Sequence, residues 1–481
     1  MRRLLLTALL VAACGPTATA PTPTPRASPS PSPTAAIAVG SAVFDGVRAR
    51  DHVEYLAAPA RGGRYSGSSG YLEAAQYVAD QFKTIGLEPL GGGGTYFQRF
   101  PMPIVDLSAT PELTRTGADA KSWKHRVDFT ETVGGRSGNG TAEAQVVVVG
   151  GGAKGSGQDD FAGVSVRGRI ALVTGPTTGT ASETSFAEGA IGILVVGDVS
   201  IRYSYIPRFF ADPIPVFAIT ETAANELLAP SGKTVAQVQS AVRARRSSPA
   251  APSPAFETDV TVRMSLPLTP VHEVEGVNIV GLLRGTDPEL SRRAVLVGGH
   301  LDGVGTDPDG TVFPGANDNA SGPAVTIEVA RALSAKRSEL RRSVVFVAFA
   351  GEEEGLLGSE AYATRMGVSP GRVESLVAYL NLDVIGCCGN TLEASEESPA
   401  LVDRIRRAAQ RLGIPFRSIR GGGSDHVTFT KRGVPAAIIL WSDIILHTPR
   451  DTIALIEVSR LQKAGDVVTT VTLELGRGEG P

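Results

Sequence analysis

Acidic residues and histidines cluster in the second half of this 481-residue chain, each shortly after an apolar run. The run "FVAFAG" leads directly into three adjacent glutamates, Glu352, Glu353 and Glu354. Neighbouring carboxylates repel one another and are costly to bury, unless cations face them. The other candidate metal-binding residues along this half are His300, Asp302, Asp318, Asp383 and His447.

Taken together, these side chains have the composition of a site for two divalent metals. Two histidines, two aspartates and one glutamate can give each metal a nitrogen and carboxylates, provided that one carboxylate bridges. Water held between two such metals is a nucleophile at neutral pH. Singly, each residue also has an ordinary interpretation: a strand-end aspartate is often a cap, and a glutamate cluster often begins a solvated helix. The set as a whole predicts a hydrolytic metal centre.

Strands and helices that alternate after residue 270 would position these residues. Apolar strands in "AVLVGGH", "SVVFVAFAG", "VESLVAYLNLDVIG" and "PAAIIL" alternate with amphipathic helical segments. This pattern indicates an α/β fold, with a mostly parallel mixed sheet covered by helices on both faces. In such sheets, ligands bind beyond the carboxyl ends of the strands, where the candidate residues fall.

The rest of the chain divides by composition into further segments. Helical spacing in "DHVEYLAA" and "YLEAAQYVADQFKTIG" precedes short β-branched runs separated by glycines, and one helix is expected over "ETAANELLAPSGKTVAQVQSAV". The β-branched runs indicate an α+β module inserted into the α/β domain. The expected ranges are a signal peptide at 1–14, a Pro/Ser/Thr-rich linker at 15–42, the first part of the α/β domain at 43–125, the insert at 126–255 and the catalytic domain at 256–476.

Five ordered motifs resemble the zinc-dependent aminopeptidase family of secreted bacterial and yeast enzymes, the bacterial leucyl aminopeptidase and aminopeptidase Y type. They are "GGHLDG", "GANDNASG", "EEEGLLGS", "NLDVIG" and "HTPRDT". The resemblance covers roughly residues 270–475 and the helical segment near 50–105, and it implies the zinc exopeptidase fold. The stretches "GRIALVTG" and "FAEGAIGILVVGD" resemble a protease-associated domain, which many relatives carry as an insert.

The resemblance implies a role for each matching position. His300 and Asp383 would bind one zinc, Glu353 and His447 the other, and Asp318 would bridge them before a cis peptide bond. Cobalt or manganese would also suit such ligands. Glu352 matches the general base, Asp302 matches the acid that hydrogen-bonds the His300 ring, and Glu354 occupies a variable position. Asp451 would support the His447 loop or act as a plain cap. In "GGGSDHVTF", Asp425 and His426 match a segment near the substrate.

One residue departs from the family pattern. Many members have a tyrosine before the last histidine, where its hydroxyl stabilises the oxyanion, and this chain has Leu446. The resemblance implies an aminopeptidase acting on peptides. A carboxypeptidase or dipeptidase on the same metal core remains an alternative, as does a non-catalytic peptide-binding surface protein. A glutaminyl cyclase shares the fold but uses one metal.

The N-terminus and the overall composition indicate a location outside the cytoplasm. "MRRLLLTALLVAACG" has the charge, apolar core and small residues of a secretory signal peptide, and "VAAC" resembles a bacterial lipobox, with ordinary cleavage near Ala13 as the alternative. We therefore expect a lipid anchor on Cys14 in the cell envelope, or secretion. A net charge of −3 without a basic stripe argues against a nucleic-acid partner. Cys387 and Cys388 could be buried thiols, a vicinal disulfide or metal ligands.

Overall fold

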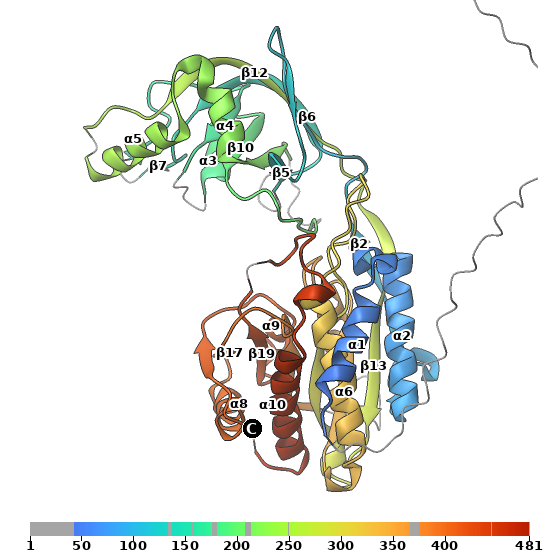
Figure 1. The fold of residues 1–481 in the computed structure, drawn as a ribbon. Coiled ribbons are helices and arrows are strands. Elements are labelled where there is room, and N and C mark those ends of the chain that lie inside the picture. The colour runs from blue at the N-terminus through green and yellow to red at the C-terminus, as the bar shows by residue number, and fades with distance from the viewer. Residues whose placement is uncertain are drawn as a thin grey trace, which may run out of the picture. The chain divides into compact units, whose positions relative to one another are not determined.

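The computed structural model describes residues 43–480, apart from 133–136, 156–157, 176–179, 207–212, 249, 366–374 and 444. The predicted signal peptide, the linker at 15–42 and Cys14 therefore lie outside the described residues. The described chain contains a nine-stranded sheet, here called the main sheet, and an eight-stranded sheet, here called the insert sheet (Figure 1). None of its helices has the length and apolar character needed to span a membrane.

The main sheet combines a parallel centre with antiparallel flanks. Its order is β1-β13-β15-β14-β16-β19-β17-β18, and β2 also pairs with β13. Strand β14 runs parallel to β15 and β16, and β16 runs parallel to β19, whereas β13 and β17 join in antiparallel fashion. The strands are β1 (Glu88–Pro89), β2 (Phe97–Ile104), β13 (His272–Leu283), β14 (Arg293–His300), β15 (Ser343–Phe349), β16 (Ser375–Leu382), β17 (Leu392–Ser395), β18 (Phe416–Ile419) and β19 (Ala436–Trp441). The predicted α/β fold with a mixed sheet is confirmed, and the parallel pairings of that sheet include its central strands.

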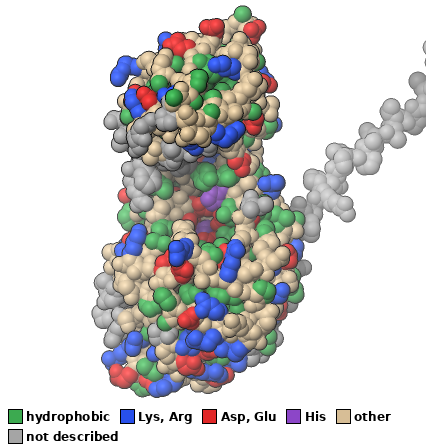
Figure 2. All heavy atoms as spheres, turned by 90° about the vertical axis from the view of Figure 1, so that its left-hand side faces the viewer, with side chains coloured by type: hydrophobic (Ala, Val, Ile, Leu, Met, Phe, Trp, Pro, Cys, Tyr) green, Lys and Arg blue, Asp and Glu red, His purple; other side chains and the backbone are tan. Residues whose placement is uncertain are grey.

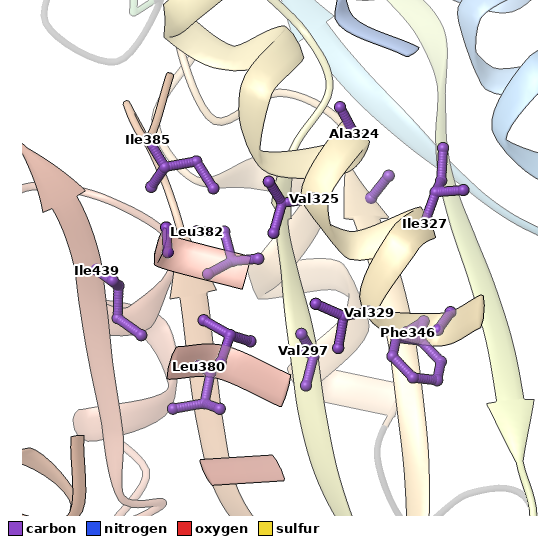
Figure 3. Close-up of a cluster of buried hydrophobic side chains, with 14 of the residues drawn as sticks. Val297, Ala324, Val325, Ile327, Val329, Phe346, Leu380, Leu382, Ile385 and Ile439 are labelled. Atoms are coloured by element: carbon purple, nitrogen blue, oxygen red, sulfur yellow. The ribbon is translucent and has the colours of Figure 1, made fainter. Parts of the chain in front are cut away.

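Helices cover both faces of the main sheet because its central strands are apolar on both sides. In β14, Val295 and Val297 join one core cluster, whereas Ala294 and Leu296 join another. The first cluster contains residues of α1, α2, α6, α8 and α10, and the second contains residues of α7 and α9. Figure 3 shows side chains of α6 packed over β14, β15 and β16. The helices are α1 (Gly46–Leu56), α2 (Ser69–Ile85), α6 (Ser321–Ser334), α7 (Leu357–Arg365), α8 (Pro399–Arg411), α9 (His426–Thr430) and α10 (Val458–Gly476).

The segment before the insert belongs structurally to the main sheet. Helix α2 begins after Ser68, whose side chain accepts a hydrogen bond from the Tyr71 N–H, and it ends at Gly86 with φ of 84°. Glycine suits this left-handed position because it has no Cβ. Strands β1 and β2 then pair with β13, so residues on either side of the insert build one sheet.

The insert sheet has the order β4-β3-β12-β6-β9-β10-β11-β5. Its strands are β3 (Glu112–Arg115), β4 (Lys121–Trp123), β5 (Phe129–Glu131), β6 (Gly140–Val148), β9 (Ile170–Val173), β10 (Gly192–Val196), β11 (Val216–Ile219) and β12 (Phe256–Leu266); β7 (Lys154–Gly155) and β8 (Gln158–Asp159) pair separately. They extend beyond the 126–255 range expected for the insert. Helix α3 (Ala181–Ala187) follows β9.

The single helix expected after β11 is two helices. The structure has α4 (Glu221–Leu228) and α5 (Val235–Ser247), separated by a short 3-10 turn. The turn ends at Gly232, whose φ of 66° is left-handed and stops the first helix. Thr234 then begins α5 with a capping box in which Gln237 is the reciprocal partner.

Candidate metal and active site

The carboxyl ends of the central strands bring the candidate residues to one edge of the main sheet. His300 is the last residue of β14, and Asp383 directly follows β16. The glutamates follow β15 after Ala350 and Gly351, and Asp318 lies in the irregular turn that precedes α6. Because β15, β14 and β16 are parallel neighbours, their ends meet at the same place.

The turn after β15 explains how adjacent glutamates can reach one site. Gly351 has φ of 67° and Gly355 has φ of 105°, so the chain leaves the extended strand conformation on both sides of the glutamates. Ligand atoms of Glu352, Glu353 and His300 consequently all lie within 4.8 Å of one another. Glu354 is instead turned inward and is 1% exposed.

Asp318 joins two groups of potential metal ligands. Its Oδ1 lies 3.4 Å from His300 Nε2, and its Oδ2 lies 3.0 Å from His447 Nε2. Asp383 Oδ1 lies 3.3 Å from His300 Nε2, and Glu353 Oε1 lies 3.0 Å from His447 Nε2. The peptide bond between Asp318 and Asn319 is cis. We call His300, Asp318, Glu353, Asp383 and His447 the ligand cluster.

Part of the ligand cluster is accessible to solvent. The side chain of His447 is 18% exposed, compared with 1% for His300 and 7% for Glu353. Figure 2 shows a recess in which histidine and acidic side chains lie together, bordered by hydrophobic side chains. Of these three residues, His447 is the one that solvent reaches most easily.

Burial and mutual repulsion strongly perturb the acids around the cluster. Burial raises the pKa of Glu352 well above its usual value, and the charges of Glu353 and Asp383 raise it further. Burial also raises the pKa of Asp302 to about 6 and that of Asp425 to about 7, although the charge of His300 opposes both shifts. Each carboxylate is costly here without a compensating cation.

In contrast to these acids, His300, His447 and Asp318 are stabilised in their charged forms. Burial lowers the pKa of His300, but Asp383 and Glu352 outweigh it and raise that pKa well above its usual value. The pKa of His447 is raised in the same way, against burial, by Glu353 and Asp318. The pKa of Asp318 falls far below its usual range because hydrogen bonds from both histidines outweigh burial. Positive charge at the histidine nitrogens is thus favoured, and a divalent cation supplies it equally well.

Asp302 makes different hydrogen bonds from those that the resemblance implies. The His300 ring lies 3.2 Å from the backbone carbonyl of Asp302, whereas the Asp302 carboxylate is 3.7 Å from Nδ1. That carboxylate accepts the backbone N–H groups of Glu352 and Glu353, at 3.3 and 3.1 Å. The chain turns after His300, so the carbonyl meets the ring and the carboxylate meets the glutamate turn.

Asp451 holds the turn that carries Asp318. Its carboxylate accepts the N–H groups of Asn317 at 2.7 Å and of Asp318 at 2.9 Å. Burial raises its pKa to about 7, with these two hydrogen bonds opposing the shift. The turn that carries Asp318 is therefore fixed by a side chain from beyond His447.

Asp425 and His426 lie at the start of α9 and are both 0% exposed. Burial lowers the pKa of His426, whereas the charges of Glu397 and Asp383 oppose this shift. The charge of Asp383 also acts on Asp425. Both side chains are therefore shielded from solvent, close enough to Asp383 for its charge to act on them.

Arg64 and the cysteine pair add features that the motifs did not reveal. Arg64 is fully buried and donates hydrogen bonds to the carbonyl oxygens of Leu301, Pro314 and Gly315, in the loops that follow His300 and precede Asp318. Burial lowers its pKa to about 10, against the pull of the nearby acids. Only its glycine-rich surroundings, "RGGRYSG", distinguish it in the sequence.

Cys387 and Cys388 form a disulfide, which was one of the three alternatives for this pair.

Fold and site together define an α/β protein with a histidine- and carboxylate-lined centre at the carboxyl ends of parallel strands. The sequence profile of peptidase family M28 matches residues 278–472. This match covers the part of the chain that carries the five motifs, and the resemblance to zinc-dependent aminopeptidases is confirmed there.

Individual relatives agree with this assignment. Aminopeptidase YwaD of Bacillus subtilis (strain 168) is 34% identical over 221 residues, which are 42% of this chain and 45% of the relative. A probable zinc metalloprotease of Leptosphaeria maculans is 33% identical over 192 residues, or 36% of this chain and 43% of the relative. The chain thus spans less than half the length of these curated relatives.

Solved structures match over a longer stretch. The aminopeptidase from Aneurinibacillus sp. strain AM-1 aligns with a TM-score of 0.64 and 22% identity, over 90% of this chain and 94% of its own. A zinc aminopeptidase from Bacillus subtilis gives a TM-score of 0.64 at 22% identity, over 91% and 97% of the two chains. At this level of identity, the structural matches establish the fold.

Proposed function

We propose that this protein is a zinc-dependent aminopeptidase that removes residues from the amino end of peptides. The observation that carries the proposal is the pair of histidine-and-acid groups that share Asp318, with one carboxylate oxygen directed to each histidine. Family membership and relatives named as a zinc metalloprotease and an aminopeptidase support the choice of metal and reaction.

The donor set fits two zinc ions. His300 and Asp383 would hold one ion, Glu353 and His447 the other, and Asp318 would bridge them, because nitrogen and carboxylate oxygen are ordinary zinc ligands. Cobalt or manganese would suit the same donors. When bound, the ions lower the pKa of a water molecule and polarise the scissile carbonyl. The crowding of acids with raised pKa values also supports a cationic occupant.

Glu352 is the proposed general base. Its carboxyl lies in the group formed with His300 and Glu353, and it is not needed to complete either group that contains Asp318. It would take a proton from the attacking water and return it to the leaving amino group. Asp302 would be a positioning residue, because its carboxylate holds the N–H groups of Glu352 and Glu353.

Asp425 and His426 complete the proposed site as candidates for substrate binding. This role is supported by their position near the ligand cluster, since the charge of Asp383 affects the pKa of both residues. Their complete burial favours a role in shaping the wall behind the ligand cluster over direct contact with a peptide in this conformation.

The sequence also supports a location in the cell envelope. We propose that residues 1–14 direct export, that Cys14 carries a lipid anchor and that residues 15–42 tether the folded part to the membrane. The range 126–255 remains our proposed protease-associated insert, with the peptidase domain at 43–125 and 256–476.

The test uses the full chain without its signal peptide, loaded with zinc, and a peptide that is free at both ends. Mass spectrometry of the products should show stepwise loss from the amino end, and a chelated sample should show none. Metal analysis should find two zinc ions per chain. Loss from the carboxyl end would replace the aminopeptidase assignment with a carboxypeptidase on the same centre. An intact peptide in the presence of two bound ions would contradict the proposed activity.

A further inference from the structure

The insert reaches the ligand cluster through the segment that follows β10. The backbone N–H of Arg202 donates to the carbonyl oxygen of His447 at 2.9 Å. The next residue, Tyr203, lies with its ring centroid 5.6 Å from that of His447, and the two ring planes meet at 84°. This is a favourable edge-to-face arrangement of aromatic rings. A side chain of the insert therefore stands beside a residue of the ligand cluster.

A buried set of charges holds this segment in place. Arg202 is 1% exposed, and its guanidinium donates to Asp307 Oδ1 at 2.8 Å, to Asp106 Oδ1 at 2.6 Å and to the Val304 carbonyl oxygen. A second insert residue, Arg126, donates to Asp307 Oδ2 at 2.8 Å and pairs with Glu131 at 2.6 Å. We call Arg126, Arg202, Asp106, Glu131 and Asp307 the arginine cluster.

The position of Asp307 links the arginine cluster to the site. Asp307 lies between His300 and Asp318 in the chain, so the loop that receives the insert joins two members of the ligand cluster. Charge-assisted hydrogen bonds to a buried guanidinium fix both distance and orientation. Tyr203 therefore belongs to a segment that is held at two points, by the bond from Arg202 to Asp307 and by the bond from the Arg202 N–H to the His447 carbonyl.

Tyr203 is exposed although its neighbours are not. Its side chain is 43% exposed, whereas Arg202, Ser204 and Tyr205 are 1%, 5% and 1% exposed. A large ring held in water next to a site leaves apolar area that a ligand can cover. Leu446, beside His447 in the chain, is apolar and half-buried. Tyr203 and Leu446 therefore both bring apolar side chains next to His447, one in space and one in the chain.

Resting on the proposed function, we propose that Tyr203 contacts the side chain of the substrate's N-terminal residue and sets a preference for apolar side chains there. In an aminopeptidase, that side chain lies beside the scissile bond, and hence beside the ligand cluster. The aromatic face of Tyr203 provides the contact, and its hydroxyl is not required. The insert is then a part of the substrate site and not a passive spacer.

The experiment compares wild type, Tyr203→Ala and Tyr203→Phe on two peptides that differ only in the first residue, leucine or glycine. In Tyr203→Ala, the ratio of kcat/KM for the leucine peptide to that for the glycine peptide should fall about tenfold or more. Tyr203→Phe should keep the ratio within about twofold, since the ring remains. Ile191→Ala, which truncates another exposed apolar side chain of the insert, should leave the ratio unchanged.

A binding measurement separates this role from support of the metal. In the zinc-loaded Glu352→Gln background, which binds without turnover, calorimetry should show that Tyr203→Ala weakens the leucine peptide about tenfold while zinc content stays at the level of the background. Loss of zinc would show that Tyr203 only supports His447, and equal losses in Tyr203→Phe and Tyr203→Ala would assign the effect to the hydroxyl. Both results overturn the proposal.

The peptide assay distinguishes an error in the assignment of Tyr203 from an error in the proposed function. If wild type shortens peptides but Tyr203→Ala has an unchanged leucine-to-glycine ratio, the assignment of Tyr203 is wrong and the proposed function stands. If wild type shortens no peptide from its amino end, the proposed function is wrong and the assignment of Tyr203 falls with it.

Discussion

The ligand cluster and the arginine cluster each combine two basic side chains with three acids, yet the acids around them differ. In the arginine cluster, two arginines face three acids, and Arg126 and Arg202 both bond to Asp307. In the ligand cluster, the histidines face a larger set of acids that includes Asp302 and Glu352 just outside it.

The pKa values show what this difference means. In the arginine cluster, hydrogen bonds and charge from His125 and Arg126 outweigh burial and lower the pKa of Glu131 to about 2. Around the ligand cluster, burial raises the pKa of Glu352 well above its usual value. The charged form of Glu131 is thus stabilised by its partners, whereas that of Glu352 is not and would gain from added positive charge.

The largest expected effect comes from changing Glu352, the proposed general base, which is not one of the proposed metal ligands. Glu352→Gln should lower kcat/KM by about 10² to 10⁴, because the side chain keeps its size but loses the proton acceptor. Zinc content should remain two per chain. Steady-state kinetics and metal analysis on the same preparation check both parts.

The adjacent glutamate gives a matched control. Burial, with the charges of Asp302 and Glu353, raises the pKa of Glu354 well above its usual value, which favours the uncharged form of its carboxyl. Glu354→Gln replaces this carboxyl by an uncharged group of similar shape and should change kcat/KM little. Equal activity of the Glu352→Gln and wild-type proteins would refute the role of Glu352 as base.

The second effect tests whether the arginine cluster is structural. Arg202→Met should lower the free energy of unfolding by about 3–5 kcal/mol, since it leaves buried acid without its partner. It should also reduce the preference for a leucine peptide, because the segment that carries Tyr203 loses its attachment. Urea unfolding and the two-peptide assay measure these changes.

An exposed arginine of the insert sheet provides the comparison. Arg263 pairs with Glu143 at 3.6 Å, with side chains 47% and 49% exposed, so Arg263→Met should cost well under about 1 kcal/mol. Identical unfolding midpoints for Arg202→Met and Arg263→Met would show that the arginine cluster contributes no special stability.

The smallest effect is a difference in pH dependence. The pKa of Glu131 is about 2 in the folded protein and about 4.5 when unfolded. The folded state therefore binds fewer protons between these values, and the stabilisation is present above about pH 4.5 and disappears as pH falls through 2. Its full size is about 3 kcal/mol.

Glu131→Gln should consequently be less stable than wild type near pH 7, and the gap should narrow as pH falls from 4.5 towards 2. Denaturant unfolding across this range provides the measurement. Glu143→Gln, in the exposed pair with Arg263, should track wild type at every pH. A constant gap for Glu131→Gln would contradict the role of its charge.

The positions of His300 and Asp383 follow from a local rule that the sequence shows. His300 and Asp383 end or follow apolar strands, and parallel strands bring such ends together wherever the remaining chain goes. The helices α1 and α2 were likewise predicted from their apolar spacing. The alternating burial of β12 was also readable, yet no strand was predicted over Phe256–Leu266.

Other features depend on tertiary contacts that no local pattern contains. Tyr203 reaches His447 only because Arg202 finds Asp106 and Asp307 in distant segments. The His300 ring was expected to contact the Asp302 carboxylate, but it lies nearer to the Asp302 backbone carbonyl. The direction of the turn after His300 decides which of these oxygens is nearer. Such choices follow from packing, which a single sequence does not specify residue by residue.

The buried arginine near the start of the folded part has a consequence for how the chain is made. Arg64 precedes its acceptor on Leu301 by 237 residues and its acceptor on Gly315 by 251 residues. During synthesis, the early helices and β1 and β2 leave the ribosome without β13 or those carbonyl groups. The strands of the insert sheet are all synthesised in the meantime. The insert can therefore fold first, and Arg64 can complete its hydrogen bonds only after Gly315 has been synthesised.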